Sequence, residues 1–215
     1  MPLASSLKPH APSHRISATI GPVLTIDDFR TALASFAHHD IAEFEGMSSA
    51  AVAAILRQGR DGTEILFIHR AEDPRDPWSG HMAFPGGRVD PGDEGRRAAA
   101  IRETREEVGL DLEEVGEQIG RLSDVQAIGR GRPLSMVITP YVFVINSVPE
   151  LVINYEVEEA VWVPVAFLAD HGNRETMPYR RAGLTLDLPC YRYQGHLIWG
   201  LTLGMVDDLL SLTEH

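Results

Sequence analysis

Cysteine and long apolar runs are the two features that this sequence of 215 residues most clearly lacks. Cys190 is the single cysteine, which excludes an intramolecular disulfide and a cysteine-rich zinc site. No apolar run approaches the ~20 residues that a membrane helix needs, and the first residues lack the continuous apolar core of a secretory signal. We therefore expect a cytoplasmic protein that does not enter a membrane.

Basic residues are also scarce, because 19 Lys and Arg stand against 31 Asp and Glu, giving a formal net charge of −12. A chain with this excess of negative charge repels a polyanion at long range, so we expect no nucleic acid partner. A small anionic substrate remains compatible with this charge if cations bridge it to the protein. The composition leaves the oligomeric state open, and a homodimer is one of the alternatives.

The composition is otherwise that of an ordinary folded protein, with 44% hydrophobic and 23% charged residues. A length of 215 residues suits one sizeable domain and is short for two. Three prolines within the first 12 residues favour a loose N-terminal arm over residues 1–25, followed by a single domain over residues 26–215. The alternative is an organellar transit peptide, because Lys8, Arg15 and several serines occur there without an acidic residue.

Hydrophobic periodicity and turn residues predict strands alternating with a few helices, which favours a mixed α/β sandwich. Residues 26–33 begin with acids, as a helix N-terminus prefers, and residues 50–56 and 63–68 suit a hairpin. Prolines and glycines punctuate residues 74–87, where we expect a loop without regular structure. Pro140 should kink its strand or place it at an edge of the sheet. The remaining expected elements are strands at 136–145 and 161–165 and helices at 95–108, 165–170 and 199–212.

The expected helix at residues 95–108 carries three glutamates on one face. Glu103, Glu106 and Glu107 stand at i, i+3 and i+4, so at ~100° per residue their carboxylates cluster. The opposite face has an apolar stripe that can pack on a sheet. A solvated surface would explain three glutamates alone, whereas the glycines at 86 and 87 and at 109, on either side of the helix, favour a functional site.

The segment around these glutamates resembles the signature of the Nudix hydrolase family, G-x5-E-x7-R-E-U-x-E-E-x-G-U, in which U is aliphatic. From Glu94 to Leu110 the sequence matches every fixed position except Thr104, which replaces an aliphatic residue. Arg88 stands where the signature has its first glycine, and Gly87 lies one residue too early. The loop before the helix is therefore one residue longer than the common form, which affects its geometry more than the metal site.

This resemblance implies an α/β/α sandwich with a mixed sheet, and hydrolysis of a diphosphate linkage in a nucleotide derivative. Glu103, Glu106 and Glu107 would ligate Mg²⁺ or Mn²⁺, because hard divalent cations prefer carboxylate oxygens. Such cations would bridge to the diphosphate and help to deprotonate the attacking water. Arg102 would orient a glutamate through a bidentate pair, and Glu94 would add a contact or pair with Arg102.

An upstream motif resembles that of the coenzyme A pyrophosphatase branch of the family, L-L-T-x-R-[SA]-x3-R-x3-G-x3-F-P-G-G. Arg70, Arg75, Gly80 and the segment Phe84-Pro85-Gly86-Gly87 correspond to it, although the gap from Arg75 to Gly80 is one residue longer. Residues 195–202 also look like this branch. Coenzyme A or an acyl-CoA is therefore the expected substrate, with ADP-ribose, a nucleoside diphosphate sugar or a dinucleotide as alternatives.

Five residues of this upstream region are expected to contact the substrate. Arg70 and Arg88 could meet phosphates, although each could equally form a surface ion pair. Gly86 and Gly87, which follow Phe84 in the motif, would let the backbone pass close to the metal and the substrate, since a Cβ there would intrude.

Three further residues have two readings each. Glu156 precedes Trp162-Val163-Pro164 at a spacing similar to family members that place a further glutamate near the metals, but a solvated turn would look the same. Tyr191 and Trp199 are candidates for stacking on a base, or ordinary core residues. Some Nudix-like domains sense nucleotides without cutting them, yet the complete set of three glutamates favours an enzyme.

Overall fold

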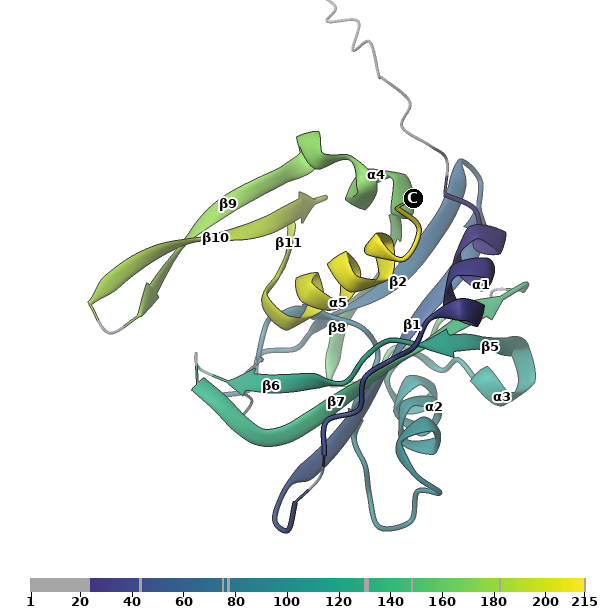
Figure 1. Ribbon diagram of the computed structural model, residues 1–215, viewed down its shortest axis with the longest axis horizontal. Coiled ribbons are helices and arrows are strands. Elements are labelled where there is room, and N and C mark those ends of the chain that lie inside the picture. The colour runs from purple at the N-terminus through teal and green to yellow at the C-terminus, as the bar shows by residue number, and fades with distance from the viewer. Residues whose placement is uncertain are drawn as a thin grey trace, which may run out of the picture.

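The computed structural model describes residues 24–42, 44–74, 76, 78–129, 132–147, 149–181 and 183–214. These residues form a mixed α/β fold with an eight-stranded sheet and a separate three-stranded sheet (Figure 1). Most of the expected N-terminal arm, and the transit-peptide alternative with it, falls on residues 1–23, outside the described residues. Thr25 already belongs to the first helix as its N-cap, where its side chain accepts a hydrogen bond from the Asp28 amide.

The elements follow the expected alternation of strands and helices. The helices are α1 (Ile26–Ser35), α2 (Arg96–Val108), α3 (Leu112–Val115), α4 (Val165–Ala169) and α5 (Gly200–Ser211), with a short 3₁₀ turn at His171–Asn173. The larger sheet contains β1 (Ser48–Gly59), β2 (Gly62–Arg70), β3 (Met82–Ala83), β4 (Gly86–Arg88), β5 (Gly116–Arg121), β6 (Val125–Gly129), β7 (Arg132–Ile145) and β8 (Val157–Pro164). The smaller sheet contains β9 (Arg174–Arg181), β10 (Leu184–Tyr193) and β11 (His196–Trp199). No helix among these described segments is long and apolar enough to cross a membrane.

Strand β1 is the centre of the larger sheet. It runs parallel to β7 and antiparallel to both β2 and β4, so the sheet is mixed, as expected. Because side chains alternate along a strand, the side chains on the two faces of β1 pack in different cores. Ala54 and Leu56 pack in a core with residues of α1 and α5, whereas Ala53 and Ile55 pack in a second core with residues of α2. The sheet therefore lies between two helical layers, which confirms the expected α/β/α sandwich (Figure 1).

Helix α2 forms and ends as its sequence predicts. Gly109 adopts a left-handed conformation with φ of 71°, and its amide donates to the Arg105 carbonyl, which ends the helix. Thr104 stands where the family signature has an aliphatic residue, and it is fully buried. Its hydroxyl donates to the Ala100 carbonyl at 2.7 Å, so the departure places no unsatisfied polar group in the core.

Of the two alternatives expected for Pro140, a kink or an edge position, the edge position is wrong. Strand β7 lies inside the sheet, with β1 on one side and both β5 and β6 on the other. Pro140 falls in the gap between these two neighbours, because the β5 pairing begins at Tyr141 and the β6 pairing reaches only Ile138. The Pro140 carbonyl accepts a hydrogen bond from the Leu122 amide at 2.9 Å. Because proline has no N–H, the gap between the two neighbouring strands leaves no unsatisfied donor there.

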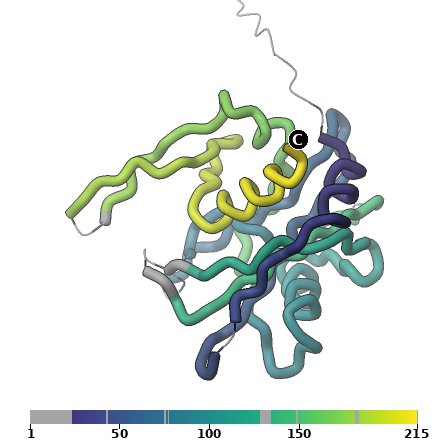
Figure 2. Tube along the Cα trace, viewed as in Figure 1, coloured from purple at the N-terminus to yellow at the C-terminus, as the bar shows by residue number. Residues whose placement is uncertain are grey.

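The expectation of a loop without regular structure over residues 74–87 is partly wrong. Two short strands, β3 and β4, form within it, because β4 can pair with Ala50 to Val52 of β1. The small sheet of β9 to β11 was also not expected, and its β9–β10 hairpin extends away from the body of the molecule (Figure 2). Cys190 is buried in this sheet.

A buried carboxylate joins α2 to the far side of the sheet. The Asp124 side chain is fully buried, and it accepts hydrogen bonds from the Thr139 hydroxyl at 2.7 Å and the Ile41 amide at 3.0 Å. Arg96 at the start of α2 lies 2.9 Å from it, and Arg121 lies 3.2 Å from it. Burial acts to raise the pKa of Asp124, but the hydrogen bonds and the Arg96 charge outweigh it and hold this pKa below its ordinary value.

We expect Asp124→Ala to lower the free energy of unfolding by about 3 to 5 kcal/mol, because it removes a buried carboxylate that pairs with the partly buried Arg96 and accepts from the Thr139 hydroxyl and the Ile41 amide. Since the folded pKa of Asp124 is depressed, its contribution is present above the ordinary value of 3.8 and is lost as the pH falls through the folded value. Urea denaturation at neutral and acid pH measures both effects. Glu117→Gln, which breaks an exposed pair with Arg30, is the control and should cost much less. Equal losses in the two variants would contradict the role of Asp124.

Candidate active site

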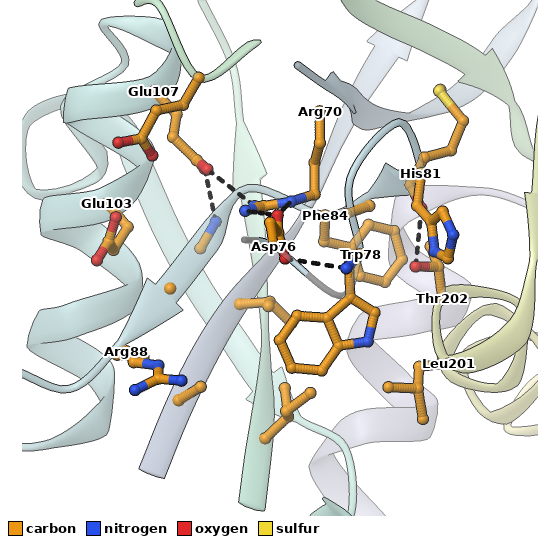
Figure 3. Close-up of a pocket in the computed structure, with 18 of the residues that line it drawn as sticks. Arg70, Asp76, Trp78, His81, Phe84, Arg88, Glu103, Glu107, Leu201 and Thr202 are labelled. Atoms are coloured by element: carbon orange, nitrogen blue, oxygen red, sulfur yellow. Dashed lines mark hydrogen bonds and ion pairs between the residues drawn. The ribbon is translucent and has the colours of Figure 1, made fainter. Parts of the chain in front are cut away.

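A single cavity of about 620 Å³ contains most of the residues that the sequence nominated, and its size is typical of ligand pockets. It is bounded by α2, β4, the turn after β2, the face of the large sheet and the start of α5. Figure 3 shows Glu103 and Glu107 at one end and Leu201 and Thr202 at the other. The cavity is therefore acidic at its α2 end and largely apolar at its α5 end.

Strand β4 and helix α2 meet at a hydrogen bond between a backbone amide and a buried carboxylate. The amide of Gly86 donates to the Glu107 carboxylate at 2.8 Å (Figure 3). A Cβ at Gly86 would lie 2.3 Å from the Ala51 carbonyl oxygen, and φ there is +149°, so only glycine allows β4 to approach β1 in this way. A Cβ at Gly87 would lie 2.5 Å from the Glu103 carboxylate carbon.

Glu107 is the most buried carboxylate of the site, with 1% of its surface exposed. Burial raises its pKa to about 8, against the opposing effects of the Gly86 hydrogen bond and the Arg70 charge. The negative charges of Glu103 and Glu156 raise it further. Glu107 therefore binds a proton at neutral pH unless a cation takes the place of that proton.

Arg102 holds the other two glutamates of the signature. Its guanidinium lies 3.0 Å from the Glu103 carboxylate and 3.4 Å from that of Glu106. Burial raises the pKa of Glu103, and the Arg102 charge acts against this rise. Glu106 is half exposed and does not line the cavity, whereas Glu103 does. The structure thus separates Glu106 from Glu103 and Glu107, which the sequence pattern had grouped together.

The partner of Arg102 is Asp93, so the alternative that Glu94 pairs with Arg102 is wrong, whereas a further contact from Glu94 stays a prediction. Asp93 accepts from Arg102 at 2.9 and 3.0 Å in a bidentate pair, which lowers the pKa of Asp93. The Arg88 carbonyl accepts a further hydrogen bond from Arg102 at 3.0 Å. Glu94 is exposed.

Arg70 is held beside Glu107 by an aspartate that the sequence did not nominate. Its guanidinium donates to the Asp76 carboxylate at 2.9 and 2.7 Å and lies 3.6 Å from a Glu107 carboxylate oxygen (Figure 3). Asp76 also accepts from the Trp78 amide at 2.9 Å, which fixes the turn. Arg70 is therefore part of a network within the site and not of a surface ion pair. Arg75, expected nearby, lies outside the described residues.

The other nominated residues differ in what they contribute. Arg88 is exposed at the cavity wall, and Glu156 lines the cavity while its carbonyl accepts from the Ala71 amide. Phe84 is buried and packs on Phe67, with ring centroids 5.1 Å apart, so its main role is in the core. Tyr191 is also a core residue, whereas Trp199 lines the cavity.

Three aromatic or apolar lining residues were missed by the sequence interpretation. Trp78 and His81 lie in the turn that was expected to be irregular, and Met205 lies on the inner face of α5. The tryptophan within a Pro- and Gly-rich segment was an available signal for Trp78. Nothing in the local pattern indicates that α5 packs over this cavity.

The donor set of the acidic end fits a hard divalent cation that keeps other ligands. In the part of the chain that the structure describes, no three His, Cys, Asp or Glu side chains are placed to hold a metal by themselves. Mg²⁺ commonly uses only one or two carboxylates and completes its shell with waters and substrate phosphates. Glu103 and Glu107 line the same cavity, and mutual repulsion contributes to the raised pKa of Glu107. A cation between them would offset that repulsion.

Comparison with known proteins agrees with this geometry. Residues 47–182 match the family model of the NUDIX domain. The uncharacterized Nudix hydrolase NudL of Citrobacter koseri is 30% identical over 190 residues, which cover 86% of this chain and 93% of the relative. The mitochondrial coenzyme A diphosphatase NUDT8 of Homo sapiens is 29% identical over 170 residues, covering 77% and 69%. The crystal structure of a MutT/nudix family protein from Enterococcus faecalis superposes with a TM-score of 0.51 at 20% identity, covering 88% of this chain and 68% of that chain, which shows a shared fold.

We expect the protein in excess chelator to lose stability as the pH rises from about 5 to about 8. The folded pKa of Glu107 is about 8 and its ordinary value is 4.5, so in this window the native state keeps a proton that the unfolded state has released. Rising pH therefore favours unfolding. Guanidinium denaturation at several pH values measures the slope, which should be shallower in Glu107→Gln. A slope that the substitution leaves unchanged would contradict the raised pKa.

Proposed function

The chain belongs to the Nudix family of hydrolases, and on this basis we propose coenzyme A or an acyl-CoA as its substrate. The family assignment makes the protein a pyrophosphohydrolase that acts on small nucleotide derivatives. One observation carries the proposal for the substrate. The segment that resembles the coenzyme A motif, from Arg70 to Gly87, forms the wall of the cavity that faces Glu103 and Glu107. The similarity to a relative named as a coenzyme A diphosphatase supports it.

The residues that would hold Mg²⁺ or Mn²⁺ are Glu103 and Glu107, with Glu156 at the same cavity. Glu106 is the third ligand that the family signature nominates, and it would have to leave Arg102 to reach the cavity. A bound cation would reduce the negative charge on the diphosphate and lower the pKa of an attacking water. The two lining carboxylates are the part of this site that the chain itself supplies.

The arginines divide between positioning and substrate binding. Arg102 is a positioning residue, because it orients Glu103 and is itself fixed by Asp93. Arg70 lies where it can orient Glu107 and still offer charge to a phosphate in the cavity. Arg88 is exposed at the cavity wall next to Gly87, and the described contacts include no ion pair of its guanidinium. Arg88 is therefore better placed than Arg102 or Arg70 to bind a substrate phosphate.

Two groups of alternatives follow from the same site. ADP-ribose, a nucleoside diphosphate sugar or a dinucleotide would also place a diphosphate at the acidic end. Each differs from coenzyme A in the chemical group that it would place at the apolar end. A sensing domain that does not cut would need no proton-binding carboxylate beside the diphosphate. Burial of Glu107 without a chemical use would destabilise such a domain, so the geometry favours the enzyme.

Activity should be absent in excess chelator and should return when Mg²⁺ or Mn²⁺ is added. At saturating metal we expect Glu107→Gln to lower kcat by roughly a hundredfold or more, because a neutral amide cannot replace the charge that holds the cation. The control is Glu114→Gln, an exposed glutamate on α3. At metal concentrations below saturation, activity should rise with pH through about 8 as Glu107 loses its proton. Turnover that survives exhaustive chelation would contradict the assigned chemistry.

The proposed substrate is tested by comparing coenzyme A, dephospho-coenzyme A and ADP-ribose. We expect kcat/KM for coenzyme A to exceed that for ADP-ribose by at least tenfold, which corresponds to about 1.4 kcal/mol of transition-state binding. Dephospho-coenzyme A should be poorer, because an arginine contact to the 3′-phosphate is lost. Product analysis should find 3′,5′-ADP and a phosphopantetheine. Similar kcat/KM values for all three compounds would contradict the substrate and leave the hydrolase assignment intact.

A further inference from the structure

We propose that the α5 end of the cavity, continued by the apolar face of the β9–β10 hairpin, binds the acyl chain of an acyl-CoA substrate. This inference rests on the proposed function and goes beyond it, because it assigns a second subsite and a preference among substrates. Its evidence comes from the distribution of charge in the cavity, from the packing of Trp199 and from two exposed leucines.

Charge is confined to one end of the cavity. Among the lining residues that the structure describes, the arginines are Arg70 on β2 and Arg88 on β4. The acidic residues lie on α2, at Glu156 and in the turn after β2. The α5 end is lined by Leu201, Met205 and other apolar side chains. Phosphates are therefore bound at the α2 end, and the part of the substrate that extends toward α5 must be uncharged.

The two polar groups at the α5 end do not favour an anion either. The Thr202 hydroxyl donates to the Met82 carbonyl at 2.9 Å, so it is already engaged (Figure 3). Burial lowers the pKa of His81, so its ring is neutral at pH 7. A pantetheine arm, whose polar groups are a hydroxyl, amides and a thiol or thioester, is uncharged and fits such an environment, because a neutral histidine can exchange a hydrogen bond with an amide.

Trp199 connects the cavity to the small sheet. Its ring lies 4.8 Å from that of His81, inside the cavity, and 5.4 Å from that of Tyr179 on β9. Trp199 therefore joins the lining of the cavity to the Tyr179 side chain of the hairpin. Figure 1 shows this hairpin reaching outward from the side of the molecule that carries α5.

The hairpin presents an apolar face beyond Tyr179. Leu186 pairs with Tyr179 across the two strands, and Leu184 and Leu188 lie on the same face, because alternate residues of a strand share a face. Leu184 is 66% exposed and Leu186 is 46% exposed. Contiguous exposed leucines on a strand that projects into solvent are unfavourable unless a ligand covers them. An acyl chain that leaves the cavity past Trp199 would reach this surface.

A chain-length series tests the subsite. Wild-type protein is assayed with coenzyme A, acetyl-CoA, octanoyl-CoA and lauroyl-CoA below their micelle concentrations. We expect KM to fall by at least tenfold from acetyl-CoA to lauroyl-CoA. Leu186→Asp should reduce the ratio of kcat/KM for lauroyl-CoA to that for acetyl-CoA by tenfold. The matched control is Thr185→Asp, which adds the same charge to the opposite face of the same strand and should leave this ratio unchanged.

The outcomes separate the inference from the function on which it rests. Cleavage of every member of the series with no effect of chain length overturns the subsite and leaves the coenzyme A assignment intact. An equal reduction in the two variants overturns it as well. Light scattering that shows a dimer in wild type and a monomer in Leu186→Asp, with the ratio unchanged, means that a second copy covers the leucines and contradicts the inference. Failure to cleave any member contradicts the proposed substrate itself.

Discussion

The hydrogen bond from the Gly86 amide to the Glu107 carboxylate is the constraint on which the site depends. It brings the edge of β4 against helix α2 and buries a carboxylate that would prefer water. This hydrogen bond alone does not offset the desolvation of the carboxylate, because the pKa of Glu107 remains raised at about 8. The site thus contains a group whose charge the protein compensates incompletely, and a cation bound in the cavity would complete that compensation.

The surrounding arginines show how the chain holds repelling carboxylates together. Arg102 belongs to α2 and Arg70 approaches that helix from the end of β2, and each is itself fixed by an aspartate, Asp93 or Asp76. Neither aspartate belongs to the three-glutamate pattern. Each aspartate therefore acts through the arginine that it binds, and these ion pairs hold the acidic end of the cavity together. The apolar end lies beside the projecting hairpin, through the contact of Trp199 with Tyr179.

Much of the fold was predictable, since each element has a local physical signal. The acids and the capping threonine of α1, the break between β1 and β2, and Gly109 after α2 act within a few residues, and the structure places these elements as expected. The expectations that failed were about neighbours. Pro140 was expected to kink its strand or place it at an edge, because proline cannot complete a continuous ladder, but the two partner strands of β7 leave a gap opposite it. Sequence periodicity carries no information about where a neighbouring strand begins.

By itself the sequence determined the family, the mixed α/β class and the helix on which the glutamates stand, because spacing along one helix is a local property. It could not determine which carboxylates share a cavity. Glu103 and Glu107 line it and Glu106 does not, because the approach of β4 and the position of Arg102 decide where each side chain lies. The conformations of the turns before α2 and after β2 place Asp93 and Asp76, which stand only 9 and 6 residues from the arginines that they hold, and the apolar end under α5 joins Thr202 to Met82 across 120 residues. Such contacts are set by how the layers pack, and only the tertiary structure decided them.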